Sequence, residues 1–175
     1  MKKLFLSVAL LISLNSLFAQ TKPHFVKYFI GDSKMAAYFP SQPNPAEMSW
    51  SQDSSKVYTM ESELDSFSFY IVSVDMKNSF DSTDAEDILI AYMDYLKSSF
   101  KVTEAAGYGK GHTMKNHASA KGIIDYWQDG KNKMSVKGWC DGKNLAIMIV
   151  DGPADYPNYN VIEVFQNGFR FPGDK

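Results

Sequence analysis

The chain has 175 residues, which is enough for one domain of ordinary size. Hydrophobic residues make up 45% of the sequence and charged residues 22%, and this composition excludes a disordered or collagen-like chain. Eighteen basic residues stand against twenty acidic ones, so the formal net charge is −2 and the basic footprint of a nucleic-acid-binding protein is missing.

The first nineteen residues have the pattern of a secretory signal peptide. Lys2 and Lys3 precede an apolar stretch from Leu4 to Ile12, and Ala19 supplies the small residue before a cleavage site. The stretch is shorter than the ~20 residues of a membrane-spanning helix. An N-terminal membrane anchor or a buried helix is the alternative interpretation. Cleavage after Ala19 would leave residues 20–175 as a single exported domain, periplasmic or extracellular, with no membrane insertion.

Four strands are expected after this segment, because β-branched and aromatic runs alternate with turn-forming residues. The prolines at positions 40, 43 and 45 end the second strand and predict an extended passage before the third. Both faces of the fourth strand are apolar, which is typical of a central strand covered on both sides. The expected strands are Phe25–Ile30, Met35–Phe39, Lys56–Ser62 and Phe67–Asp75.

A helix is expected at about residues 83–100. Thr83 and Glu86 match a capping box, in which two side chains bond free backbone N–H groups of the first turn. Acidic residues in that turn also favour a helix start through the helix dipole. The apolar residues that follow form one stripe at helical spacing, which we expect to pack on a sheet. They are Ile88, Leu89, Tyr92, Met93, Leu96 and Phe100.

The segment Lys101–Ser119 is the least regular part of the chain. Its glycines at 107, 109 and 111 are not spaced like those of a dinucleotide-binding loop, so a flexible loop is expected. His112 and His117 lie in the same segment. Two histidines could begin a transition-metal site or serve an enzyme, but a third ligand or a carboxylate would have to come from elsewhere. The sequence therefore predicts no metal site here.

Two tight turns and a final helix are expected in the last third of the chain. Asp-Gly pairs at 129–130 and 141–142 are strong signals for turns between antiparallel strands. Pro157 near the first turn and Gly168 after the last one delimit the helix. The expected elements are strands at Ala120–Gln128, Lys133–Cys140 and Asn144–Asp151 and a helix at about 157–167.

The resulting order β-β-β-β-α-β-β-β-α predicts an α+β fold, with a mainly antiparallel sheet and helices packed on it. Cys140 is the only cysteine, so no intramolecular disulfide can form. Because Cys140 alternates in register with apolar residues, we expect a small buried side chain rather than a catalytic or intermolecular thiol.

Sequence signatures of catalysis are missing. The chain has no G-x-S-x-G elbow, no phosphate-binding loop with a lysine and no H-E-x-x-H pair. Glu61, Glu63 and Asp65 alternate among serines, a pattern more typical of a solvated turn than of a buried acid–base pair. We therefore expect no enzyme, and we predict neither a cofactor nor a metal.

The aromatic residues give one candidate binding surface. Trp127 and Trp139 lie on neighbouring hairpin strands, and Trp139 shares its strand face with Lys137 and Ser135. Aromatic residues that cover a sheet beneath helices are the ordinary explanation. A tryptophan that shares a face with polar residues can instead be exposed, so Trp127, Lys137 and Trp139 are the predicted partner-binding surface.

Several short motifs follow one another along the chain: Tyr38-Phe39-Pro40-x-x-Pro43, Ala120-Lys121-Gly122, Asp125-Tyr126, the run from Leu145 to Pro153, and Val164-Phe165-x-x-Gly168-Phe169-Arg170-Phe171. This succession resembles the PsbP-like superfamily, which includes DcrB-like bacterial proteins and a Ran-GTPase-binding import factor. The similarity spans about Phe25 to Phe171, and Gly168 stands where relatives often have serine.

The resemblance implies an α/β/α sandwich around a central antiparallel sheet and a role in binding or stabilising other proteins. It transfers no residue-level site, because the family shares packing positions and not a catalytic motif. The predicted function is that of an exported, non-catalytic binding or assembly protein with an unknown protein partner. The alternative is a carrier of a small apolar ligand, held in a cleft lined by Tyr92, Tyr126 and Met148.

Overall fold

The structure is a computed structural model that describes residues 23–154 and 158–175. The predicted signal peptide and its cleavage site lie outside the described residues, as do Tyr156 and Pro157 at the expected start of the last helix.

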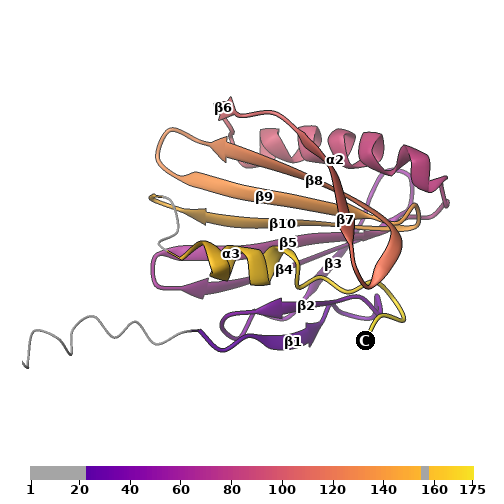
Figure 1. The fold of residues 1–175 in the computed structure, drawn as a ribbon, viewed down its shortest axis with the longest axis horizontal. Helices are drawn as coiled ribbons and strands as arrows, with labels where there is room; N and C mark the ends of the chain where they lie inside the picture. The colour runs from indigo at the N-terminus through magenta and orange to yellow at the C-terminus, as the bar shows by residue number, and fades with distance from the viewer. Residues whose placement is uncertain (1–22, 155–157) are drawn as a thin grey trace, which may run out of the picture.

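One large antiparallel sheet dominates the fold (Figure 1). Its strands lie in the order β3-β4-β5-β10-β9-β8-β6, and β7 pairs with the other half of β8. The prediction of a mainly antiparallel sheet in an α+β fold is confirmed. The strand bounds are β3 Glu47–Trp50, β4 Lys56–Leu64, β5 Phe67–Asp75, β6 Glu104–Ala105, β7 Gly109–Met114, β8 His117–Gln128, β9 Lys133–Cys140 and β10 Asn144–Gly152.

The remaining elements are a separate hairpin and the helices. The hairpin pairs β1 (Val26–Phe29) with β2 (Ala36–Phe39), as predicted. A short 3₁₀ helix, η2 (Ser82–Asp84), leads into α2 (Ala85–Ser99). The last helix, α3, covers Tyr159–Gln166.

Two hydrophobic cores lie on the two faces of the sheet. In β5, Phe69 and Ile71 belong to one core while Val72 and Val74 belong to the other. The same division holds in β10, where Met148 and its even-numbered neighbours face away from the odd-numbered ones. Because side chains alternate along a strand, a strand that is apolar on both faces must be covered on both. The two central strands were predicted correctly for this reason.

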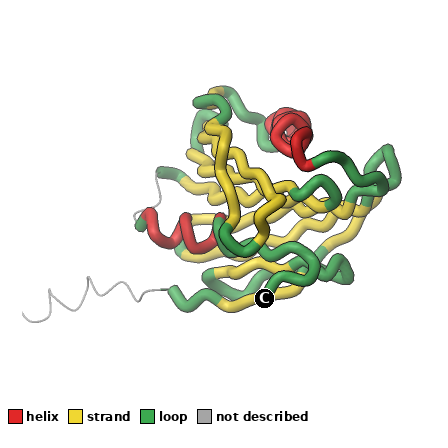
Figure 2. The backbone as a smooth tube through the Cα atoms, turned by 45° about the vertical axis from the view of Figure 1, so that its right-hand side comes forward, coloured by secondary structure: helices red, strands yellow, loops and turns green. Residues whose placement is uncertain are grey.

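Each face has its own cover. α2 packs on β8 and β9, whereas α3 packs on β9, β10 and strand β2 of the hairpin (Figures 1 and 2). The stripe of α2 is buried at Leu89, Met93 and Leu96, as its spacing predicted. β9 approaches the helix closely at Gly138, where an added Cβ would lie 2.8 Å from Cδ2 of Leu89.

The expectation of a flexible loop at Gly107, Gly109 and Gly111 is wrong for the last two glycines, which lie in a strand. Residues 109–114 form β7, and β8 begins at His117. The pairing of β7 with β8 has two irregularities, and Gly107 and Gly111 have positive φ angles. A strand of this irregular geometry does not show a regular alternation in its sequence. Five of the six β7 residues lack a fully buried side chain, so there is no alternation of apolar residues to detect.

Two other local differences have similar causes. β3 was not predicted, because all four of its residues are exposed at the edge of the sheet and show no apolar face. The capping box at Thr83 does not form. Asp81 caps η2 instead, accepting a hydrogen bond from the Thr83 backbone N–H at 2.9 Å. The observed bounds of α2 and α3 are close to the predicted ones. At the start of α2, the 3₁₀ helix η2 takes the place of the first predicted turn.

Candidate functional site

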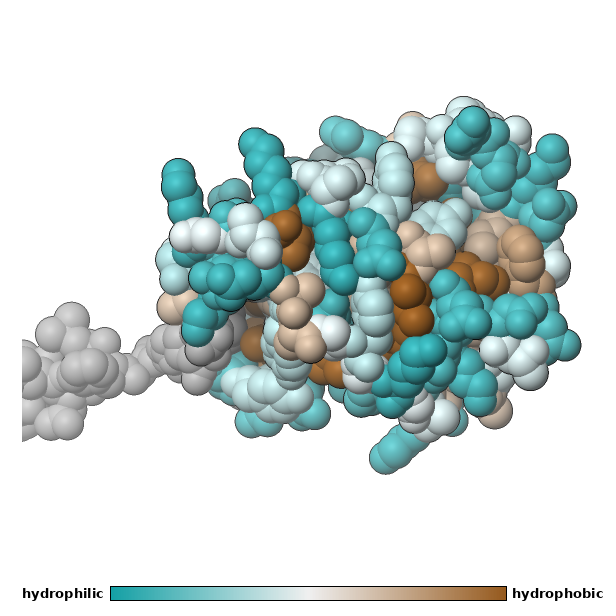
Figure 3. All heavy atoms as spheres, turned by 90° about the horizontal axis from the view of Figure 1, so that it is seen from above, coloured by the Kyte–Doolittle hydropathy of each residue, from teal (hydrophilic) through white to brown (hydrophobic). Residues whose placement is uncertain are grey.

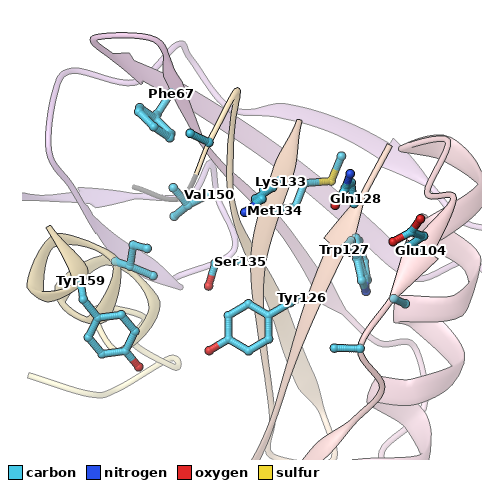
Figure 4. Close-up of a pocket in the computed structure, with 14 residues that line it drawn as sticks. Phe67, Glu104, Tyr126, Trp127, Gln128, Lys133, Met134, Ser135, Val150 and Tyr159 are labelled. Carbon is cyan, nitrogen blue, oxygen red and sulfur yellow. The ribbon is translucent and has the colours of Figure 1, made fainter. Parts of the chain in front are cut away.

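An open pocket lies beside α3, at the end of the sheet where β8 and β9 meet their turn. α3 packs mainly on β9, β10 and β2, and the neighbouring end of β8 keeps a partly exposed face. The pocket has a volume of about 540 Å³ and is lined from β5, β6, β8, β9, β10 and α3 (Figure 4). Its apolar lining includes Val150, Phe67, Ile162, Trp127 and Met134. The volume lies within the range of ~300–1,000 Å³ that is usual for ligand pockets.

Two tyrosines flank the mouth of this pocket. Tyr126 of β8 is 49% exposed and Tyr159 of α3 is 57% exposed. The hydroxyl of Tyr126 points toward Tyr159, and Ser135 lies between the two rings in this view (Figure 4). The pKa of Tyr159 is raised by partial burial first, and then by Tyr126 and Glu163. The two phenols and a carboxylate therefore share one local environment.

Four polar side chains complete the lining. They differ in chemistry: Glu104 carries a carboxylate, Lys133 an ammonium, Gln128 an amide and Ser135 a hydroxyl. The Ser135 hydroxyl accepts a hydrogen bond from the Gln166 side chain at 3.1 Å, which fixes its position against α3. The pocket thus offers both donors and acceptors around an aromatic mouth.

The predicted partner surface of Trp127, Lys137 and Trp139 does not exist as one exposed surface. Trp127 and Trp139 are each 2% exposed and Lys137 is 8% exposed. Trp127 belongs to the core under α2, while Trp139 belongs to the core under α3. The two tryptophans therefore lie on opposite faces of the sheet, and the expected exposure of Trp139 is wrong.

The polar row on β9 is buried because it holds the C-terminal end of α3. The indole N–H of Trp139 donates to the Gln166 carbonyl at 2.7 Å, which satisfies a carbonyl at the end of the helix. Nζ of Lys137 donates to Oδ1 of Asn167 at 2.8 Å and lies 4.7 Å from the centroid of the Trp139 ring. Burial lowers the pKa of Lys137. These residues dock a helix and are not available to a partner.

The two histidines are not brought together. Nδ1 of His117 lies 3.0 Å from Asp174, and Nε2 lies 3.5 Å from Asp141. Its ring also packs on Phe171, with centroids 4.4 Å apart, so His117 helps to dock the C-terminal segment. His112 lies on β7, and burial lowers its pKa. Among the described residues, no three His, Cys, Asp or Glu side chains are grouped to hold a metal ion.

The cleft suggested for an apolar carrier is not formed. Tyr92 lies on α2 and packs against the core under that helix, whereas Met148 is fully buried in the core on the opposite face. Only Tyr126 of the three expected residues lines the pocket. The second pocket tyrosine, Tyr159, was not predicted as a site residue, because nothing in the spacing of the sequence shows that α3 and β8 converge.

A buried charge network near β6 was also not predicted. Asp125 is fully buried and accepts three hydrogen bonds, from the backbone N–H groups of Gly107 and Tyr126 and from the indole of Trp127, at 2.7–2.9 Å. Nζ of Lys97 on α2 lies 3.6 Å from its carboxylate. Lys97 also donates to Tyr108, at 2.7 Å. This network ties α2 to the crossing from β6 to β7.

No protein-family model matches the sequence, and no curated protein matches it significantly. In the part of the chain that the structure describes, no helix combines the length and the hydropathy needed to cross a bilayer.

Proposed function

We propose that this chain is a non-catalytic binding protein that holds its ligand in the pocket between α3 and β8. The observation that carries the proposal is the pair of half-exposed tyrosines at the pocket mouth. Large aromatic side chains are usually buried, and two that converge on one pocket from different elements are typical of a binding site.

The other reactive groups support binding over catalysis. The Cys140 thiol is fully buried, and burial raises its pKa to about 11. Both ring nitrogens of His117 face carboxylates of the protein itself. The Asp125 carboxylate is occupied by three hydrogen-bond donors. A nucleophile or base that serves chemistry needs access to its substrate. Cys140 and Asp125 are fully buried, and the partly exposed His117 is already paired with two carboxylates.

The sequence predicted a non-catalytic binding protein with a protein partner and left a small-ligand carrier as the alternative, and the pocket supports a small ligand. Export and a PsbP-like α/β/α sandwich would both suit a binding role, and we keep them as proposals. The proposed binding surface, however, moves from Trp127, Lys137 and Trp139 to the pocket, because Lys137 and Trp139 dock α3 and only Trp127 lines the pocket.

The second candidate function is binding of a partner protein at the edge of the sheet formed by β3, away from the pocket. Met48 and Trp50 are exposed on β3, which is the edge strand at the far end of the sheet. An extended segment of another protein can pair with such an edge and place its side chains beside these two residues.

Native mass spectrometry of the protein purified from its source tests the proposal. We expect a bound small molecule, and we expect Tyr126→Ala with Tyr159→Ala to abolish its retention. Tyr95→Ala is the matched control, because Tyr95 is 71% exposed on α2, which covers the other face. If the double variant retains the small molecule, the pocket is not its binding site. A co-purified protein that is lost with Trp50→Ala would establish the second candidate instead.

A further inference from the structure

The pocket chemistry indicates which class of ligand it would hold. We propose that it binds an uncharged oligosaccharide, with sugar rings lying against Tyr126 and Tyr159 and their hydroxyl groups bonded to the polar side chains of the wall. This inference rests on the proposed function of the same pocket.

The aromatic mouth is the first part of the argument. A pyranose ring presents an apolar face of C–H groups and a rim of hydroxyl groups. An aromatic ring that is half in contact with water can cover such a face, and its phenolic hydroxyl can bond the rim. Tyr126 and Tyr159 are about half exposed and reach the pocket from a strand and a helix (Figure 4).

The polar wall is the second part. Hydroxyl groups both donate and accept hydrogen bonds, so a saccharide can use an amide, a hydroxyl, a carboxylate and an ammonium group together. Gln128, Ser135, Glu104 and Lys133 provide these four types within the one pocket. A purely apolar ligand would desolvate these groups without replacing their hydrogen bonds, which is unfavourable.

Charge is the third part, and it favours a neutral ligand. Glu104 and Lys133 carry opposite charges, so the charged side chains of the lining sum to zero. The carboxylate of Glu163 on α3 acts on Tyr159 from outside the lining and adds negative potential at the mouth. A phosphate, a nucleotide or a fatty acid would approach this carboxylate with only one lysine in its favour.

The shape of the pocket agrees with a chain-like ligand. The exposed tyrosines leave the mouth open to solvent, and the core beneath is filled, with Val150 only 3% exposed. The surface seen from above is mainly hydrophilic, and its apolar side chains gather between the centre and the right of the view (Figure 3). An open pocket allows a longer saccharide to extend beyond its bound unit, whereas an enclosed apolar ligand would need a closed cavity.

The test uses the purified full chain and four trisaccharides of similar size. Maltotriose, cellotriose and the N-acetylglucosamine trimer are neutral, and trigalacturonate is the anionic control. Isothermal titration and the shifts of the pocket amides in NMR spectra report binding. We expect at least one neutral trisaccharide to bind and trigalacturonate to bind at least tenfold more weakly.

Substitutions then assign the contacts. Tyr159→Ala and Tyr126→Ala should each weaken the neutral trisaccharide about tenfold. Tyr159→Phe should keep most of the affinity, because it retains the ring, and Tyr95→Ala should leave the affinity unchanged. Equal affinity of the Tyr159→Ala variant and the unmodified chain would overturn the inference.

The outcomes separate this inference from the function on which it rests. If no neutral trisaccharide binds but another co-purified small molecule is lost with the two tyrosines, the saccharide inference fails and the binding function stands. If trigalacturonate binds most tightly, the charge argument fails and the inference with it. If the tyrosine variants retain every ligand, both proposals fail together.

Discussion

At the scale of single residues, burial decides what each reactive side chain can do. Cys140 lies in the core under α2, where loss of water raises the pKa of its thiol from the ordinary 9.0 to about 11. The neutral thiol is the only form that this environment favours. The residue therefore acts as a small apolar group, as the alternation in the sequence predicted.

The raised pKa predicts how stability changes with pH. The folded chain keeps the Cys140 proton where the unfolded chain loses it, so this stabilisation is complete below pH 9.0 and is lost as the pH rises through about 11. Between about pH 8 and pH 10.5, the unmodified chain should lose about 2 kcal/mol more unfolding free energy than Cys140→Ala.

Urea denaturation at both pH values measures this difference. Tyrosines also ionise in this range, but they are common to the two proteins and their effect cancels in the comparison. Parallel pH profiles for the two proteins would contradict the prediction. So would rapid reaction of the native thiol with a disulfide reagent near neutral pH.

Residue-scale prediction from the sequence failed where a polar side chain is buried by a particular contact. The alternation on β9 correctly grouped Ser135, Lys137 and Trp139 on one face. It could not show that this face meets the C-terminal end of α3, where carbonyl and amide oxygens accept the two N–H donors. Polar residues in a strand predict a solvated face only when no helix terminus covers them.

At the scale of elements, the network around Asp125 holds the passage from β6 to β7. Its carboxylate accepts from the Gly107 backbone, which lies between the two strands, and from Trp127 beneath it. Lys97 brings α2 to the same carboxylate, 3.6 Å away. A buried carboxylate with three donors and a nearby cation is well satisfied, and its removal leaves those groups without partners.

We predict that Asp125→Ala lowers the unfolding free energy by about 3 kcal/mol or more. Hydrogen exchange of the Gly107 amide should also become faster, because this N–H loses its acceptor. Asp94→Ala is the control within the same network. Its side chain is 57% exposed, so its loss should cost less than about 1 kcal/mol. Equal effects of the two substitutions would show that burial of Asp125 is not what stabilises the network.

Element prediction succeeded where burial is regular and failed where it is not. Helix α2 buries one face at helical spacing, and β5 and β10 are continuous apolar runs buried on both faces, so the sequence shows each of these elements. β3 and β7 lie outside the central strands and are mostly exposed, so their pairing depends on neighbours and not on their own pattern.

At the scale of the whole molecule, the pocket is a result of how the elements meet. It takes side chains from six elements between Phe67 and Ile162, and no motif joins them. Tyr126 and Tyr159 stay exposed because α3 covers the centre of its face and leaves the end of β8 open. A site of this kind follows from the docking angle of one helix, which the periodicity of the sequence does not specify.

The same arrangement predicts how the two cores share stability. Ile147 points to the core under α2, and Phe165 fills the core on the other side, where its ring lies 5.3 Å from that of Phe69. Ile147→Val should cost about 1 kcal/mol and Phe165→Leu about 2 kcal/mol of unfolding free energy. The sheet separates the two sites, so the double variant should show the sum within about 0.5 kcal/mol.

Unfolding should nevertheless remain a single transition for all four proteins. Both cores use alternate side chains of the same strands, β5 and β10, so neither core can dissolve while the other keeps its sheet. Urea titration followed by tryptophan fluorescence and by circular dichroism measures the additivity of the free energies and the number of transitions. Trp127 and Trp139 report unfolding of the cores on opposite faces of the sheet. Two separate transitions would mean that one layer leaves independently, and a coupling well above 1 kcal/mol would mean that strain passes through the sheet.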